Sequence, residues 1–397
     1  MKFSSRLNSI KPSMTLAIDA QAKELKSQGV DVIGFGAGEP DFPTPDNIKE
    51  AAIKAIQNNE TRYPPVSGTD KLKKAIISKF EKENKVSYAP NQILVSSGAK
   101  QSFYNLAQAL WEPGDEIIVP SPYWVSYPDM ILLSGAKPKI VETTASNGFK
   151  LTPDQLNDAV SQYTKAIVIN SPSNPTGSAY EKKELQSLAE CAIRNGLLII
   201  SDEIYEKIIF DGFEQVSVAS LGDEVKKNSV IINGASKAYS MTGWRIGYIA
   251  AEPEIVSAIN KLQGQITSGA CSISQAAAAE ALSGPQDYLI DRVQEFQKRR
   301  DFVLATLESI SGVSCHKPVG TFYCFPDFSG VLGTSYGGKQ IKDSLDLGAF
   351  LLEEAKVALV PGVPFGAKAN MRFSFATSME VLEEGLSRIK KAFNKLS

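Results

Sequence analysis

The sequence predicts an α/β protein with a mostly parallel, seven-stranded sheet flanked by helices, plus a smaller α+β domain. Three observations support this fold class. Short runs rich in Val and Ile, each bounded by turn residues, recur between residues 92 and 251. Helical patterns fill several of the gaps between these runs, and after Pro285 the alternation gives way to a long amphipathic pattern. Short apolar runs without clear alternation are typical of strands buried on both faces, and strands that alternate with helices are typical of parallel sheets.

The predicted strands of the sheet follow one another along the first two thirds of the chain. They are 92–97, 116–121, 138–143, 166–172, 197–203, 229–234 and 245–251. Helices are predicted in the gaps, for example at "QSFYNLAQALW" (101–111) and "EKKELQSLAECAIRNG" (181–196). The second of these ends in Asn195-Gly196, which is a common helix C-terminal signal. In sheets of this kind, ligands bind at the carboxyl ends of the strands.

The change of pattern after Pro285 predicts two domains. We expect a large domain over residues 45–285 and a small domain formed by residues 1–44 and 286–397. The stretch "QDYLIDRVQEFQKRRDFVLATLESI" (286–310) predicts a long amphipathic helix. Two strand candidates follow it, "TFYCFPDF" (321–328) and "NMRFSFA" (370–376). A chain of 397 residues is long enough for such an arrangement.

Composition excludes several classes of protein. The net charge of −2 provides no basic surface for nucleic acid. No apolar run approaches the roughly 18 residues that a membrane span needs, and the N-terminus lacks the apolar region of a secretory signal. The four cysteines show no CxxC pairing, as is typical of reduced thiols. We therefore expect a cytoplasmic protein that has neither a nucleic-acid nor a membrane partner.

The histidine count restricts the chemistry. His316 is the only histidine, and it lies in the loop-like stretch "SCHKPVG" (314–320). A Ser-His-Asp triad, a multi-histidine metal site or a histidine base would all have to use it. We expect a structural or surface role for His316 and no metal. Two glycine-rich stretches also fail as nucleotide motifs. "GFGAGEP" (34–40) has Glu39 in place of the third glycine, and "GTSYGGK" (333–339) lacks the following Ser or Thr.

Polar side chains follow several of the predicted strands. Small residues at 98–100 begin a helix directly after a strand, where backbone N–H groups favour an anion. Asn174 lies in "NSPSNPTG", Asp202 and Tyr205 lie in "SDEIY", and Lys237 lies in "GASKAYSMTGWRIGY". Each of these has an ordinary reading as a turn, helix cap or surface residue. Because parallel strands end at one rim, however, the set together matches the parts of a pyridoxal phosphate pocket.

The lysine stretch resembles the signature of the class I and II aminotransferases, which are fold-type I pyridoxal-phosphate enzymes. The resemblance extends along nearly the whole chain, through "AGEPDFPTP", "YPPVSGTDKLKKAI", "SPYWVSYPDM", "NSPSNPTG", "SDEIY", "GTFY" and "MRFSFA", in the order of the family. It is closest to the bacterial aspartate aminotransferase subgroup that includes prephenate-active members. The stretches that carry this finer likeness are "LNSIKPSMTLAI", "GAKQ" and "SPYWVSYP".

The resemblance implies the catalytic roles. Lys237 forms an aldimine with the cofactor and then moves the proton between Cα and C4′. Burial and nearby cations are expected to lower its pKa. Asp202 keeps the ring nitrogen protonated, Asn174 and Tyr205 donate to the ring oxygen, and Trp124 stacks on the ring.

The resemblance also implies the residues that hold the phosphate and the substrate. Those for the phosphate are Gly98, Ala99, Lys100, Ser236 and Arg245, with Tyr63 contributed by the other subunit of a homodimer. Those for the substrate are Arg372 and Gly38 at the α-carboxylate, Trp124 and Asn174 beside the ring, and Lys100 and Lys11 toward a distal carboxylate.

The activity implied is transfer of the amino group of L-aspartate to 2-oxoglutarate by a ping-pong mechanism, with prephenate as a further acceptor. Three alternatives remain open from the sequence. The first is a transaminase for aromatic or other amino acids. The second is a β-C–S lyase on the same fold, and the third is a non-enzymatic ligand sensor fused to a DNA-binding module, for which the chain leaves little room.

Overall fold

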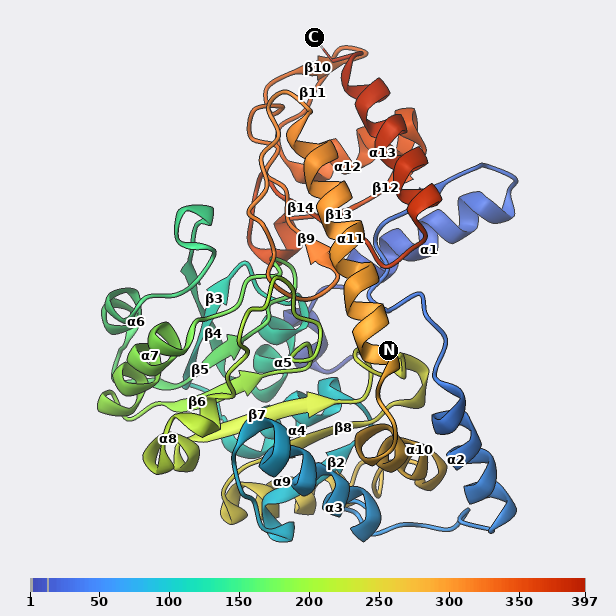
Figure 1. The fold of residues 1–397 in the computed structure, drawn as a ribbon. Helices are drawn as coiled ribbons and strands as arrows, with labels where there is room; N and C mark the ends of the chain where they lie inside the picture. The colour runs from blue at the N-terminus through green and yellow to red at the C-terminus, as the bar shows by residue number, and fades with distance from the viewer. Residues whose placement is uncertain (1–2, 13, 397) are drawn as a thin grey trace.

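The computed structural model describes residues 3–12 and 14–396, and its largest element is a seven-stranded sheet (Figure 1). Its strands are β2 (Ile93–Ser96), β3 (Glu116–Ser121), β4 (Lys137–Glu142), β5 (Thr164–Asn170), β6 (Leu198–Asp202), β7 (Ser229–Gly234) and β8 (Gly247–Ala250). They lie in the order β2-β8-β7-β6-β5-β3-β4, and only β8 is antiparallel to its neighbours. All seven predicted strands coincide with these, which confirms the α/β prediction.

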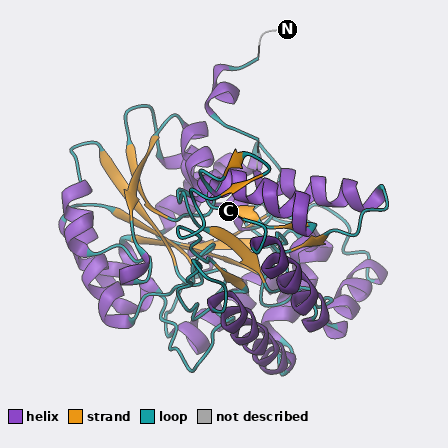
Figure 2. Ribbon diagram, turned by 90° about the horizontal axis from the view of Figure 1, so that it is seen from above, coloured by secondary structure: helices purple, strands orange, loops and turns teal. Residues whose placement is uncertain are grey.

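Helices cover both faces of this sheet (Figure 2). On one face lie α4 (Ala99–Leu110), α5 (Ser126–Ser134) and α9 (Pro253–Gly264), and on the other α2 (Asp46–Gln57), α3 (Asp70–Lys79), α6 (Pro153–Ala159), α7 (Lys182–Arg194), α8 (Asp223–Lys227) and α10 (Ser272–Ser283). Successive strand residues alternate between the two resulting cores. Ile199 packs in one core and Ile200 in the other. This double burial explains why the strands are continuous apolar runs.

The remaining elements gather at the top of Figure 1, away from the sheet. They are α1 (Met14–Ser27), α11 (Tyr288–Glu308), α12 (Ser344–Phe350), α13 (Met379–Phe393), β1 (Ile33–Gly34), β9 (Tyr323–Cys324), β10 (Ser335–Tyr336), β11 (Lys339–Gln340), β12 (Val357–Ala358), β13 (Val360–Pro361) and β14 (Met371–Ser374). β1 pairs with β12, so the N-terminal segment joins the C-terminal part of the chain. The domain limits at residues 45 and 285 remain a prediction.

Two stretches that the sequence analysis singled out form only short strands in this region. The run 321–328 forms only the short strand β9, because Pro326 has no N–H to continue the ladder. "GTSYGGK" forms the β10–β11 hairpin, whose turn residues Gly337 and Gly338 both have positive φ. In the part of the chain that the structure describes, no helix is both long and apolar enough to cross a membrane.

Candidate active site

A cavity of about 430 Å³ lies at the carboxyl ends of the parallel strands, within the size range of small-molecule sites. It is lined by predicted site residues from both regions of the chain. These are Gly38, Ala99, Lys100, Trp124, Asn174, Asp202, Tyr205, Ser236, Lys237, Arg245 and Arg372. The register of the sheet explains their convergence, since Asn170 at the end of β5 pairs with Asp202 at the end of β6, and Asp202 pairs with Ile232 near the end of β7.

Three predicted site residues lie outside the cavity lining. Gly98 immediately precedes Ala99 at the N-terminus of α4. Tyr63 is 93% exposed, in the segment before α3. Lys11 is exposed in the segment before α1, where its backbone contacts the carboxylate of Asp129. The role of Tyr63 in another subunit and the role of Lys11 in substrate binding remain predictions.

Lys237 follows β7 and projects its amine into the cavity. The half-buried side chain donates from Nζ to the carbonyl oxygen of Gly38 at 2.7 Å. Burial and the neighbouring guanidinium groups of Arg372 and Arg245 lower the pKa of Lys237 to about 8, against an opposing contribution from Glu39. A substantial fraction of the amine is therefore neutral near physiological pH, as a proton acceptor requires.

Asp202 ends β6 and is 5% exposed. Its Oδ2 accepts a hydrogen bond from Tyr127 Oη at 2.6 Å, and its Oδ1 accepts one from Ile204 N at 3.2 Å. Burial raises the pKa of Asp202, although these hydrogen bonds and the charge of Lys237 oppose that shift. A buried carboxylate at the cavity wall would be stabilised further by a cationic N–H from a ligand.

Arg372 on β14 reaches the same cavity from the other region of the chain. It is 3% exposed, and its two terminal nitrogens donate to Asn174 Oδ1 at 3.1 Å and to Gly36 O at 2.8 Å. Within the described residues, its buried Nε has no hydrogen-bond partner. A buried guanidinium with an unused donor is a suitable site for a carboxylate ligand.

The turn between β2 and α4 is closely packed at two glycines, Gly98 and Gly247. Gly98 has φ +91°, and a Cβ at this position would lie 2.3 Å from Arg245 Nη2. A Cβ at Gly247 would lie 2.1 Å from the backbone nitrogen of Ala99. Arg245 itself has φ 56° and donates to Thr242 O at 2.8 Å. A helix N-terminus next to a guanidinium forms an anion site.

Eight residues of the cavity lining were not predicted from the sequence, among them Tyr127, Asn170 and Tyr323. Tyr127 donates to Asp202, as described above. Asn170 accepts from Asn174 N at 2.8 Å and donates to the carbonyl oxygen of Asp202 at 3.0 Å. Tyr323 lies 3.2 Å from the hydroxyl of Tyr205, and the Arg372 guanidinium lies 4.5 Å from its ring centre. All three occur in stretches that carried the family resemblance, which was the available signal.

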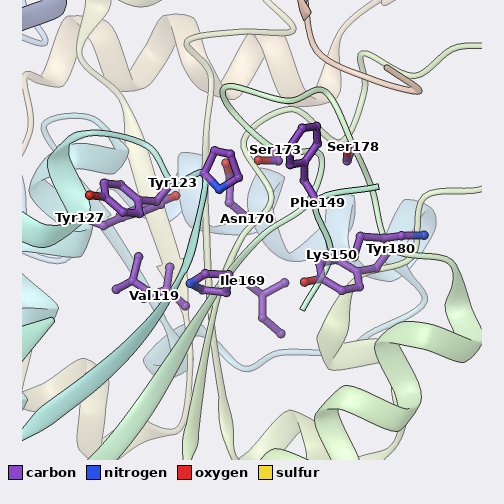
Figure 3. Close-up of a pocket in the computed structure, with 13 residues that line it drawn as sticks. Val119, Tyr123, Tyr127, Phe149, Lys150, Ile169, Asn170, Ser173, Ser178 and Tyr180 are labelled. Carbon is purple, nitrogen blue, oxygen red and sulfur yellow. The ribbon is translucent and has the colours of Figure 1, made fainter. Parts of the chain in front are cut away.

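A second cavity of about 30 Å³ lies behind this wall and shares Tyr127 and Asn170 with the first (Figure 3). Ser178, whose buried hydroxyl has no partner among the described residues, also lines it. It has room for a water molecule but not for a cofactor. His316 packs edge-on against Phe149 at 6.0 Å and is outside the lining of the larger cavity.

The residues of the larger cavity fit pyridoxal 5′-phosphate. Asp202 offers a carboxylate for a protonated ring nitrogen, and the Gly98 turn with Arg245 offers an anion site for the phosphate. Lys237 offers an amine of lowered pKa for the aldehyde. The structure thus combines the three features that this cofactor requires.

Comparison with known proteins agrees with this geometry. Residues 30–389 match the family model "Aminotransferase class I and II". The aspartate/prephenate aminotransferase of Cereibacter sphaeroides is 49% identical over 98% of this chain and 97% of its own length. The solved aspartate aminotransferase of Rhizobium meliloti has a TM-score of 0.97 at 45% identity and full coverage of both chains. The Thermus thermophilus aspartate aminotransferase, solved with maleate, has a TM-score of 0.93 at 39% identity, covering 99% of this chain and 100% of that chain.

Proposed function

Because this chain belongs to the class I and II aminotransferases, which depend on pyridoxal 5′-phosphate, we propose that it transfers the amino group of L-aspartate to 2-oxoglutarate. The products are oxaloacetate and L-glutamate, formed in two half-reactions at one site. The observation that carries the aspartate specificity is that the cavity wall holds Arg372 and Lys100 in addition to Lys237 and Arg245. A dicarboxylic substrate requires one cation for each carboxylate.

When bound, the cofactor supplies an electron-withdrawing ring that stabilises negative charge at the substrate Cα. Lys237 accepts the Cα proton with its neutral amine and returns it in the reverse direction. Asp202 keeps a proton on the ring nitrogen, because a buried carboxylate stabilises a facing cation. Asn174 and Tyr205 would hold the ring oxygen by hydrogen bonds, and Trp124 would lie against the ring. Arg245 and Ser236 hold the phosphate together with the turn of Gly98 and Ala99.

Arg372 binds the α-carboxylate through its unused donor, assisted by the N–H of Gly38. Lys100 binds the distal carboxylate. Its ammonium lies 5.0 Å from the ring centre of Trp124, and burial, together with Arg245, lowers its pKa. The Thermus thermophilus relative was solved with maleate, itself a dicarboxylate. This supports a dicarboxylic substrate for the present chain.

Lys11 is proposed to assist with dicarboxylic substrates and with prephenate as a second amino acceptor, since the Cereibacter sphaeroides relative is named for both activities. We further propose a cytoplasmic homodimer in which Tyr63 of each subunit reaches the phosphate of the other. The almost complete exposure of Tyr63 in the single chain supports this arrangement. The division into a large domain of 45–285 and a small domain of 1–44 and 286–397 belongs to the same proposal.

A panel of amino donors tests the substrate class. Aspartate and glutamate should give the highest kcat/KM with 2-oxoglutarate or oxaloacetate as acceptor, ahead of aromatic and aliphatic donors. Lys100→Ala should reduce kcat/KM for the dicarboxylic donors by about 10- to 100-fold and leave monocarboxylic donors little changed. Lys165→Ala, at a lysine whose side chain is 53% exposed, is the matched control.

Two outcomes would contradict the proposal. If Lys100→Ala lowered kcat/KM equally for all donors, Lys100 would not be the residue that binds the distal carboxylate. Release of pyruvate and ammonia from a cysteine conjugate without any 2-oxo acid would instead identify a β-lyase on the same fold.

A further inference from the structure

The segment that starts at the end of β6 has polar side chains on two faces, one toward the cavity and one turned away from it. Asp202 and Tyr205 of this segment line the cavity. Glu203 and Glu206 lie on the opposite side, outside that lining, and Glu203 is 1% exposed. The proposed reaction uses neither carboxylate. A buried carboxylate destabilises a fold unless its charge is compensated, so these two side chains require an explanation.

The negative charge of Glu206 is compensated by an ion pair and by hydrogen bonds from neighbouring side chains. It forms an ion pair with Lys79 at the end of α3, and the two side chains are 10% and 1% exposed, respectively. Asn84 Nδ2 donates to Glu206 Oε2 at 2.9 Å, and Lys79 Nζ donates to Asn84 Oδ1 at 2.7 Å. Burial opposes ionisation of Glu206, but Lys79 and Asn84 outweigh it and lower the pKa of that carboxyl.

Asn233 connects this network to the segment that carries Lys237. Its Nδ2 donates to Glu206 Oε1 at 2.6 Å, and its Oδ1 accepts from Gly234 N at 2.7 Å. The side chain is buried, at 2% exposure. Gly234 lies against β8, since a Cβ there would be 2.7 Å from Ile246 O. Only Ala235 and Ser236 separate this anchored point from Lys237.

The link between Glu206 and Asn233 lies just beyond the end of the β6–β7 ladder. Asp202 and Ile232 are the last register pair of β6 and β7, and Glu203 N donates to Ile232 O at 2.9 Å just beyond it. After this rung β6 continues into the turn that holds Tyr205, whereas β7 runs on beside β8 to Gly234 before the turn that holds Lys237. The Glu206–Asn233 hydrogen bond joins the two segments beyond the last rung.

We propose that Glu206 and Asn233 are positioning residues that fix Lys237 relative to Asp202 and Tyr205, and that Lys79 supplies the countercharge that keeps Glu206 ionised inside the protein. The inference rests on the proposed roles of Lys237 and Asp202. A proton carrier has to be held close to its target atom, because a displacement of about 1 Å can reduce a rate by roughly 10²-fold. An ionised carboxylate is a stronger acceptor for the Asn233 amide than a neutral group would be.

Three variants of the cofactor-loaded enzyme test this inference. Asn233→Leu removes the link but retains the ion pair and most of the side-chain volume. The double variant Lys79→Met/Glu206→Leu removes both charges together, so that neither is left buried alone. Lys150→Met/Glu184→Leu is the control, because it removes an ion pair of 2.5 Å between two residues outside the lining of the larger cavity.

The measurements are kcat, KM for aspartate and the pH midpoint of the visible absorbance of the bound cofactor. In Asn233→Leu and the double variant, kcat should fall by about 10- to 100-fold. KM should change by less than about threefold, because Arg372, which is proposed to bind the substrate α-carboxylate, is not altered. The absorbance midpoint should also move away from the wild-type value, because Lys237 changes its surroundings. The control should retain wild-type values for all three.

The proposal is overturned if folded Asn233→Leu and the folded double variant keep the wild-type kcat and absorbance midpoint, because the network would then be structural only. If either variant does not fold, Asn233→Ala decides by the same measurements, since it leaves the Lys79–Glu206 pair in place. Failure of the proposed function is recognised separately. A wild-type enzyme that does not use aspartate would still show, through the absorbance midpoint, whether Asn233 positions Lys237.

Discussion

Two lysines lie on opposite sides of the β6–β7 rim, and the charged groups nearest to them have opposite signs. Lys79, 3% exposed, is paired with the carboxylate of Glu206 and donates to Asn84. Lys237 faces the cavity, close to the guanidinium groups of Arg372 and Arg245, and its pKa is lowered to about 8. The same side chain therefore faces a carboxylate on one side of the rim and two guanidinium groups on the other.

This difference shows that burial alone does not make a lysine reactive. In a medium of low dielectric constant, neighbouring charges act strongly on the protonation equilibrium. An anionic neighbour stabilises the ammonium, while cationic neighbours and burial destabilise it. The sequence of each lysine's own segment does not fully reveal which case applies, because Arg372 and Glu206 come from distant segments.

The largest expected effect is that of Lys237→Ala. Removal of the amine should reduce the rate of amino transfer by about 10⁴-fold, because no other group in the cavity is proposed to carry the Cα proton. Steady-state kinetics with aspartate and 2-oxoglutarate measures this loss. A variant that kept a tenth of the wild-type kcat would exclude Lys237 as the proton carrier.

The next effect is on stability. Lys79→Met leaves Glu206 buried without its countercharge, so the free energy of unfolding should fall by about 3–5 kcal/mol. Denaturant titration of the purified protein measures it. The control is Lys49→Met, which breaks an exposed pair whose side chains are 46% and 86% exposed and should change stability by less than about 1 kcal/mol. Equal losses in the two variants would mean that the Lys79 pair is not a buried charge pair in solution.

Glu203 extends the comparison to a buried carboxylate without an ion pair of its own. Its Oε1 accepts hydrogen bonds from Ser201, Ser217 and Val218, whereas Oε2 has no partner among the described residues. Burial and the nearby charge of Glu206 raise the pKa of Glu203 from 4.5 to about 7, with Lys79 and these hydrogen bonds opposing. The folded protein therefore binds more protons than the unfolded chain between these two pH values.

The contribution of Glu203 to stability should consequently fall as pH rises from 4.5 to about 7 and stay low above that range. The difference in unfolding free energy between wild type and Glu203→Gln, measured at several pH values, isolates this contribution. The wild type should lose up to about 3 kcal/mol relative to the variant across the window. A difference that does not depend on pH would show that Glu203 keeps its ordinary pKa.

The smallest expected effect separates the two arginines. Arg372 lowers the pKa of Lys237 more than Arg245 does. Arg372→Gln should therefore raise the pKa of Lys237 by about one unit, and Arg245→Gln by less. The pH dependence of amine labelling at Lys237 in the cofactor-free variants measures both shifts. The reverse order would place the dominant cation at the phosphate site instead.

The sequence was sufficient to predict the sheet and most of the cavity wall. Strands buried on both faces are continuous apolar runs, and each polar residue that follows such a run reaches the same rim, as Asn174, Asp202 and Lys237 do. Arg372 was predicted only through the family resemblance, because no local pattern shows that β14 faces the cavity.

The network behind the rim could not be predicted in this way. Asn84 and Glu206 are 122 residues apart in the chain, and nothing in the surrounding sequence of either indicates the other. The same holds for Arg372 as a neighbour of Lys237, because β14 and the segment after β7 are far apart in the chain. Contacts between distant segments depend on tertiary packing and therefore become visible only in the structure.

Competitive labelling of both lysines tests the central contrast most directly. The cofactor-free protein is exposed to a trace of an amine-reactive reagent between pH 6 and 11, and the modified peptides are quantified by mass spectrometry. Lys237 should be labelled with a midpoint at about pH 8, while Lys79 should remain unlabelled as long as the protein is folded. A Lys237 midpoint near that of an ordinary lysine, about 10.4, or labelling of Lys79 before Lys237, would contradict the account.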